Sequence, residues 1–276
     1  MAGEAEVVQH YASAGIAERI LAALKAVQGA DAPVTPDALA PLDHFHGRGV
    51  LATEELAALL KPQAGERLLD IGCGIGGPAR WIAARYGCHV TGVDLTAEFC
   101  RAAEALNAAT GLTQQVRILH GSALALPLAA AEFDRAYSQN VVMNIADKAG
   151  FYREAWRVLK PGGMLALSNL AAGPKGPPHY PVPWAATAAT SFLATPEETR
   201  NDLLAAGFAI VSFRDTTTEV LAAQAKLRQR LEAQGLPTLG VHVIMGERMK
   251  EFQLNTARSM QEDRLRALEI LLRKPG

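Results

Sequence analysis

The chain lacks a disulfide framework, a surplus of basic residues and any long apolar run. Three cysteines in 276 residues are an odd number and do not build a disulfide framework. Lysine and arginine total 27 against 28 aspartate and glutamate, so the basic surplus that nucleic-acid binding selects is missing. No uncharged apolar run approaches the roughly 20 residues of a membrane-spanning helix. These features predict a cytoplasmic protein with no nucleic-acid partner and no membrane insertion.

A targeting signal is also missing from the N-terminus. The segment MAGEAEVVQHYASAG begins acidic and has no basic region followed by an apolar run, so we expect no signal peptide. A chain of 276 residues can bury a substantial core in one large or two small domains. Stability therefore needs no disulfide staple, and we expect no bound metal. Its oligomeric state is not predicted.

Between about Thr53 and Asp215, short apolar runs alternate with longer segments of helical spacing. This alternation is typical of a parallel sheet covered by helices. Asp147 can cap a helix that ends near Leu159, and Thr195 opens another. The apolar run Leu265–Leu272 can rejoin the sheet as its last strand. The other expected strands are Arg67–Ile71, His89–Asp94, Val116–His120, Phe133–Ser138, Met164–Leu170 and Phe208–Arg214.

Three segments stand outside this alternation. In open α/β sheets ligands collect at the carboxyl ends of the strands, so we expect segment 1–46 to be an N-terminal lid. The core is expected at 47–215, and it contains a second lid segment, the insertion 171–194. A helical insertion follows at 216–263, for which plain surface packing is an equal alternative. The last strand of the core is expected within 264–276.

A glycine-dense turn joins the first expected strand to a helix. It contains Gly72, Gly74 and Gly77, and glycine permits backbone dihedrals and close ligand approach that a Cβ forbids. Asp94 ends the next strand, 20 residues after Gly74, where a carboxylate can accept both ribose hydroxyls of an adenosine. An adenosine-containing cofactor is therefore expected, with a ligand-free glycine turn as the alternative.

Asp70 and Pro78 distinguish two such cofactors. The pyrophosphate of a nicotinamide dinucleotide needs free amide donors and the positive end of a helix. Pro78 has no amide proton, and Asp70 would repel a pyrophosphate. The Asp70 carboxylate can instead help to hold the cationic groups of S-adenosylmethionine. A nicotinamide-dependent oxidoreductase stays as the disfavoured alternative.

At this point the chain resembles the class I S-adenosylmethionine-dependent methyltransferases, from about Asp43 to Arg214. Besides the glycine turn, the resemblance rests on Val93–Asp94–Leu95–Thr96, Phe133–Asp134 through Ser138–Gln139–Asn140, and Leu159–Lys160–Pro161–Gly162–Gly163. It implies a Rossmann-like α/β sheet, mostly parallel, with helices on both faces and a helical lid. The cofactor-binding residues that it implies are Asp70, Gly72, Cys73, Gly74, Asp94, Leu95, Ser122, Ala123, Ser138 and Gln139.

Two positions depart from the pattern of this family. Many relatives read Gly-Asp-Ala where this chain has Gly121–Ser122–Ala123, so a hydroxyl replaces a carboxylate expected near the adenine amino group. Asn144 stands where several relatives place a histidine near the acceptor, so this position does not supply a histidine base. These departures keep open the alternative of a module that binds S-adenosylmethionine without transferring its methyl group.

A closer resemblance is to small-molecule methyltransferases of the sarcosine and dimethylglycine type, and a weaker one is to quinol and tocopherol methyltransferases. The closer resemblance is carried by the segments 43–49 and 181–184 and by the Gly-Gly-Pro-Ala-Arg turn at 76–80. The leading expectation is methyl transfer to the nitrogen of a small amine or amino-acid-like compound, because aromatic faces favour a cationic amine. A lipophilic phenol, quinol or isoprenoid is the alternative, favoured by a long apolar pocket. The candidate substrate-binding residues are Phe45, Asn140, Tyr180 and Trp184, and the catalytic candidates are His46, Asn144 and His179.

Overall fold

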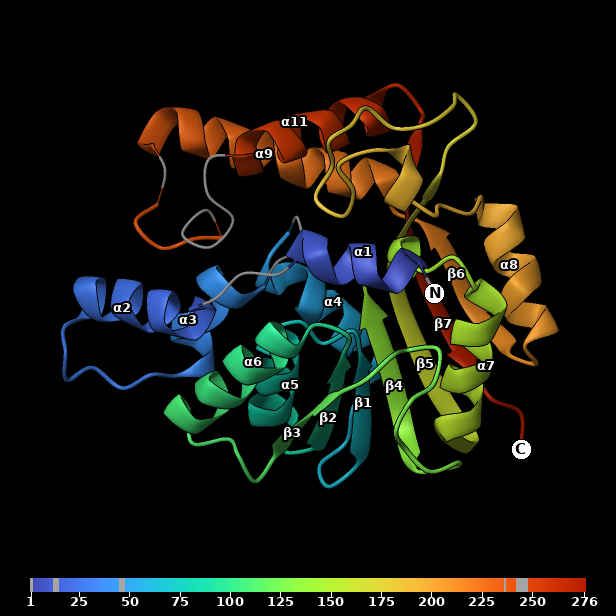
Figure 1. The fold of residues 1–276 in the computed structure, drawn as a ribbon, viewed down its shortest axis with the longest axis horizontal. Helices are drawn as coiled ribbons and strands as arrows, with labels where there is room; N and C mark the ends of the chain where they lie inside the picture. The colour runs from blue at the N-terminus through green and yellow to red at the C-terminus, as the bar shows by residue number, and fades with distance from the viewer. Residues whose placement is uncertain (1, 12–14, 45–47, 236, 242–247) are drawn as a thin grey trace.

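The computed structural model describes residues 2–11, 15–44, 48–235, 237–241 and 248–276. Within these residues the chain forms a seven-stranded sheet in the order β3-β2-β1-β4-β5-β7-β6 (Figure 1). Strands β1 to β5 pair in parallel, and β7 runs antiparallel between β5 and β6. The strands are β1 Arg67–Ile71, β2 His89–Asp94, β3 Val116–His120, β4 Phe133–Gln139, β5 Leu159–Ala172, β6 Ala209–Asp215 and β7 Leu265–Arg273. The predicted mostly parallel, Rossmann-like sheet is confirmed.

Both faces of the sheet are covered by helices. Side chains alternate along each strand, so that Leu68 of β1 joins an apolar cluster with α4, α5 and α6, whereas Leu69 joins a cluster with α7 and α8 on the other face. The helices of these two layers are α4 Val50–Leu60, α5 Gly77–Tyr86, α6 Ala97–Ala109, α7 Lys148–Val158 and α8 Pro196–Ala205. Helices therefore pack against both faces of the sheet, as the sequence predicted.

Local capping explains where two of these helices begin. The Asp147 side chain accepts a hydrogen bond of 2.8 Å from the Gly150 amide and starts α7. Thr195 and Glu198 form a reciprocal capping box at the start of α8. Both helix starts were predicted from sequence, since side-chain oxygens at these positions satisfy otherwise unpaired amides.

The remaining helices belong to the segments outside the core alternation. Helix α1 (Ala2–Tyr11) lies over the upper edge of the sheet, and α9 (Thr217–Gln234) and α11 (Arg248–Gln261) lie beside each other further above it (Figure 1). Helices α2 (Ile16–Gln28) and α3 (Pro36–Asp43) instead pack beside α6 and α5. Among the described helices, none has both the length and the apolar character needed to cross a membrane.

The apolar side chains of these outer helices are only partly buried. In α2, Ile16, Ile20 and Leu24 are buried, but Val27 is 47% exposed. In α9, Leu227 is 41% exposed, so the buried face of that helix does not continue along its whole length. Each of these helices is therefore buried along only part of its length.

Candidate active site

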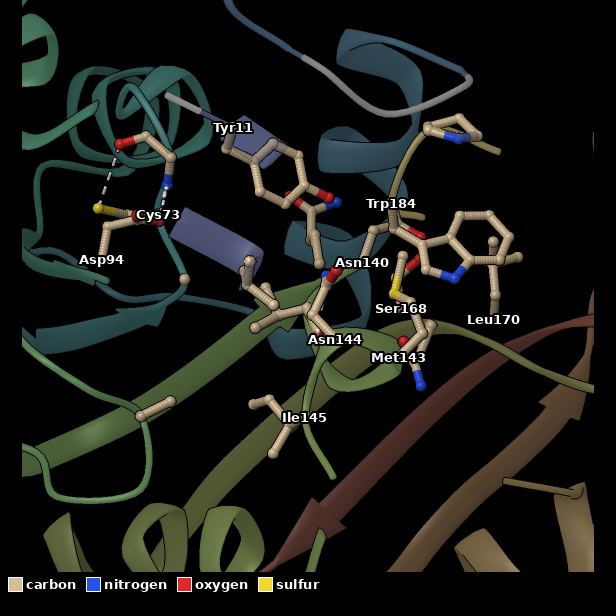
Figure 2. A pocket seen from close by; sticks show the side chains of 18 of the residues that line it. Tyr11, Cys73, Asp94, Asn140, Met143, Asn144, Ile145, Ser168, Leu170 and Trp184 are labelled. Carbon is tan, nitrogen blue, oxygen red and sulfur yellow. Dashed lines mark hydrogen bonds between the residues drawn. The ribbon is translucent and has the colours of Figure 1, made fainter. Parts of the chain in front are cut away.

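A cavity of about 480 Å³ opens at the carboxyl ends of the central strands. Its floor comes from the glycine turn after β1, the ends of β2 and β4, and the short helix Val142–Asn144. Helices α1, α9 and α11 supply its roof. Figure 2 shows side chains from both groups turned toward one space. The volume is in the range of small-molecule sites.

The glycine turn folds back on the end of β2. Gly72 has a φ of 81°, and a Cβ added to it would lie 2.3 Å from a methyl group of Val141. Its amide donates to the Val93 carbonyl at 2.8 Å, and the Gly74 amide donates to the Asp94 carboxylate at 2.8 Å. A side chain at position 72 would therefore displace the turn that lines the cavity.

Asp94 is held in place from two sides. One carboxylate oxygen accepts from the Gly74 amide and the other from the Thr96 amide, each at 2.8 Å. Burial raises the pKa of this carboxyl, while the two backbone donors act in the opposite direction. Because each carboxylate oxygen can accept a second hydrogen bond, Asp94 remains able to bind the two ribose hydroxyls of an adenosine.

Asp70 lies at the other side of the turn, fully buried in the cavity floor. Burial raises the pKa of its carboxyl to about 8, with Tyr137 acting to lower it and the charge of Asp94 acting to raise it. A cation placed beside this carboxyl would restore its ionised form. The amino group of S-adenosylmethionine fits that requirement, and Pro78, which also lines the cavity, offers no amide to a pyrophosphate.

Beyond the glycine turn, the cavity is lined by Tyr11 of α1, by the side-chain amides of Asn140 and Asn144, and by Trp184. The Tyr11 ring points into the cavity near Asn144 (Figure 2). Burial raises the pKa of the Tyr11 hydroxyl far above its ordinary value, although the Asn144 side chain beside it acts in the opposite direction. Asn140 directly follows β4 and has a φ of 56°, a left-handed conformation that asparagine tolerates. Trp184 lines the same space and donates to the Ser191 hydroxyl at 3.0 Å.

Most of the cofactor-binding candidates line this cavity. Ser138 is the exception, because its buried hydroxyl donates to the Ile71 carbonyl at 2.8 Å and ties β4 to β1. The candidates that line the cavity are Asp70, Gly72, Cys73, Gly74, Asp94, Leu95, Ser122, Ala123 and Gln139. Their common position is compatible with the predicted role, which stays a prediction.

The substrate-binding and catalytic candidates are more widely separated. Asn140, Asn144 and Trp184 line the cavity. Phe45 and His46 lie outside the described residues. The structure does not bring the remaining two, Tyr180 and His179, to the cavity wall.

His179 lies outside the cavity, where its ring contacts the carboxylate of Glu262. Its Nε2 lies 2.7 Å from a carboxylate oxygen of Glu262, and its backbone amide donates to the Ser259 hydroxyl at 2.8 Å. Tyr180 follows it and packs at the margin of an apolar cluster that contains Trp184 and Met260. We therefore assign no proton transfer to His179.

Several cavity residues were missed by the sequence reading. They come from the roof helices: Glu4, Val7 and Tyr11 from α1, and Val220, Gln224, Gln253, Thr256 and Met260 from α9 and α11. No local motif marks these positions. The available signal was the topology alone, because segments that adjoin the ligand edge of a sheet can reach the ligand.

Comparison with known proteins agrees with this geometry. Residues 69–167 match the family described as "Methyltransferase domain". Over 111 residues the chain is 40% identical to 24-methylenesterol C-methyltransferase 2 of Oryza sativa subsp. japonica, covering 40% of this chain and 31% of that protein. Over 129 residues it is 32% identical to phosphoethanolamine N-methyltransferase 1 of Arabidopsis thaliana, covering 47% of this chain and 26% of that protein. The chain thus spans about a third or less of the length of these relatives.

A solved structure resembles the chain over its whole length. Geranyl diphosphate C-methyltransferase from Streptomyces coelicolor A3(2), determined with Mg²⁺, geranyl-S-thiolodiphosphate and S-adenosyl-L-homocysteine, superposes with a TM-score of 0.71. The alignment covers 99% of this chain and 98% of that one at 19% identity. This likeness shows that the two chains share a fold, roof helices included.

Proposed function

We propose that the chain transfers the methyl group of S-adenosylmethionine to a small, largely apolar molecule, because residues 69–167 match a methyltransferase domain. The observation that carries the proposal is the chemistry of the cavity beyond the glycine turn. Its described lining there is apolar or neutral, and the apolar members are Met143, Ile145, Leu170, Trp184, Phe192, Val220 and Met260.

Charged side chains near this space already have partners. Asp147 caps α7 through the Gly150 amide. Arg48 also lines the cavity, but its guanidinium donates two hydrogen bonds to the Glu55 carboxylate. A zwitterionic amino acid would bury its carboxylate here without a free cationic partner among the described lining residues, and an unpaired buried charge is strongly unfavourable. This argues against the amino-acid-like acceptor expected from sequence.

Four buried side-chain amide atoms of the cavity lining have no hydrogen-bond partner among the described residues. They are Nε2 of Gln139, Oδ1 of Asn144, Oδ1 of Asn169 and Oε1 of Gln224, and the first and third bear on the ligand. Buried polar atoms are normally satisfied, so a ligand is expected to complete them. Asn169 can accept from a hydroxyl of the acceptor, and Gln139, which ends β4, can donate to the carboxylate of the cofactor. Both roles suit a neutral acceptor with one polar group.

The bound cofactor supplies an electrophilic methyl group on a sulfonium. The chain has to hold the acceptor nucleophile in line with that methyl and to keep water out. Tyr11 and the roof helices cover the cavity, and the raised pKa of Tyr11 keeps its hydroxyl protonated at neutral pH. Tyr11 therefore orients the acceptor as a hydrogen-bond donor and does not remove a proton from it.

A small amine is the second candidate acceptor. It is favoured by Trp184, whose ring lines the cavity and can face a cation. The similarity to a phosphoethanolamine N-methyltransferase adds to this reading. It is weakened because Tyr180 does not line the cavity and Phe45 lies outside the described residues.

Isotope transfer to two panels of acceptors tests the proposal. The protein is incubated with methyl-labelled S-adenosylmethionine and either neutral phenols, quinols and isoprenoids or small amines and amino acids, and products are identified by mass spectrometry. Label is expected in the first panel. Val220→Glu, which puts a carboxylate into the apolar lining, should abolish that transfer, whereas Leu227→Glu at an exposed site of the same helix should not. Label confined to the amine panel would reverse the assignment.

A further inference from the structure

The loop after β3 lies where the adenine of the cofactor should be. In the sheet, Asp94 at the end of β2 is paired with His120 at the end of β3. Gly121, Ser122 and Ala123 therefore follow directly beside the carboxylate that is suited to the ribose, and all three line the cavity. An adenine attached to that ribose and directed away from the glycine turn meets this loop.

The loop itself carries no carboxylate for the adenine amino group. Ser122 is the residue in the place where many class I relatives have aspartate. Its hydroxyl oxygen accepts from the Leu124 amide at 3.0 Å. A hydroxyl held in this way is a weaker acceptor than an ionised carboxylate, because charge-assisted hydrogen bonds are roughly twice as strong as neutral ones.

A carboxylate reaches the same place from another part of the chain. Glu4, in the first turn of α1, accepts a hydrogen bond from the Ser122 hydroxyl, 118 residues away in sequence. Its side chain also lines the cavity. Ser122 uses one carboxylate oxygen of Glu4, and a carboxylate has capacity for several donors. The chain thus restores at the cavity wall the charge that the β3 loop lacks.

We propose that Glu4 recognises the adenine of S-adenosylmethionine by accepting a hydrogen bond from its exocyclic amino group. This rests on the proposed use of that cofactor. The adenine contact is then made by the roof helix α1 in place of the core loop. Cofactor binding consequently requires α1 to lie over the sheet, and a bound cofactor holds it there.

Contacts elsewhere along α1 keep this helix in place without Glu4. Nε2 of His10 lies 3.0 Å from the Pro183 carbonyl oxygen. The Tyr11 ring packs against the Phe99 ring, with 5.8 Å between the ring centroids. A change confined to the Glu4 side chain should therefore leave α1 docked. Glu6, exposed on the same helix, offers a matched control.

Two cofactor analogues that differ at a single position test the proposal. S-adenosylhomocysteine has an amino group at C6 of the base, which donates, whereas S-inosylhomocysteine has a carbonyl there, which accepts. Calorimetry on the full chain should show that the wild type prefers the adenine analogue. Glu4→Gln should weaken binding of the adenine analogue about tenfold to a hundredfold while improving binding of the inosine analogue, because the new amide can donate to its carbonyl. Glu6→Gln should match the wild type.

A relocated carboxylate separates recognition from a merely structural role. Glu4→Ala should lose the preference for adenine, and adding Ser122→Asp should restore it by returning the charge to the core loop. Equal weakening of both analogues by Glu4→Gln, or no restoration by Ser122→Asp, would overturn the proposal while leaving the cofactor assignment intact. If the wild type bound neither analogue, the cofactor assignment itself would fail, and this inference with it.

Discussion

Asp70 should couple cofactor binding to the release of a proton. Its carboxyl is fully buried in the cavity floor, and burial raises its pKa from 3.8 to about 8. At pH 7 about nine in ten molecules then carry a proton on this group. The ammonium of a bound cofactor favours the ionised carboxylate, so binding at pH 7 should release roughly 0.9 proton from Asp70.

Calorimetry of S-adenosylhomocysteine binding in buffers of different ionisation enthalpy directly measures the number of protons released on binding. Because the cofactor binds the ionised form, affinity should rise about tenfold per pH unit up to pH 8 and level off above it. Asp70→Asn should remove both the proton release and this pH dependence. If wild type and Asp70→Asn released equal numbers of protons between pH 6 and 8, Asp70 would not be the group that meets the cation.

The stability of the cofactor-free protein provides an independent readout of the same pKa. A carboxyl whose pKa is raised on folding binds its proton more tightly in the folded state. Its contribution to the free energy of unfolding is therefore fully present below pH 3.8 and is lost as pH rises toward 8. Across that window, the free energy of unfolding of the wild type should fall by about 1.4 kcal/mol per pH unit relative to Asp70→Asn. Urea denaturation at several pH values would measure the difference, and parallel curves would refute it.

Three further outcomes are expected. Asp94→Ala should weaken S-adenosylhomocysteine binding by about 2 to 4 kcal/mol in calorimetry, because it removes charge-assisted hydrogen bonds to two ribose hydroxyls; an unchanged dissociation constant with a normal melting curve would remove it from the site. Hydrogen exchange should slow in segments 1–46 and 171–194 when S-adenosylhomocysteine is added, while β1 is protected without it; equal rates with and without ligand would make both segments static. Arg80→Ala should lower the free energy of unfolding by about 3 to 5 kcal/mol in urea denaturation, since it removes a cationic partner, 2.9 Å away, from the buried Asp43 carboxylate, whose other oxygen contacts the His44 ring; a change below 1 kcal/mol, as at exposed ion pairs, would contradict this.

The elements that sequence predicted well depend on neighbours along the chain. Strands Arg67–Ile71, His89–Asp94 and Val116–His120 have the expected bounds, because short apolar runs and the turns beside them are local signals. The helix starts at Asp147 and Thr195 were also predicted, since a cap acts within three residues. The glycine turn belongs to the same class, because only a residue without Cβ fits at position 72.

The parts that sequence did not predict depend on contacts between distant residues. Strand β7 was expected as the last strand, but not between β5 and β6, because strand pairing has no local signature. The proposed roles of Glu4 and Tyr11 depend on where α1 docks, which the acidic N-terminal sequence does not indicate. His179 looked free to act as a base until the structure placed Glu262, 83 residues later, beside it.

Cofactor choice is the point at which the whole assignment can be tested most directly. Asp70, Asp94 and Pro78 line the cavity, and the predicted site uses them for the cation and ribose of S-adenosylmethionine and not for a pyrophosphate. Calorimetric titration of the same protein with S-adenosylhomocysteine and with NAD, under identical conditions, measures that choice. We expect saturable binding of S-adenosylhomocysteine and no heat from NAD. Tight binding of NAD with no response to S-adenosylhomocysteine would contradict the assignment.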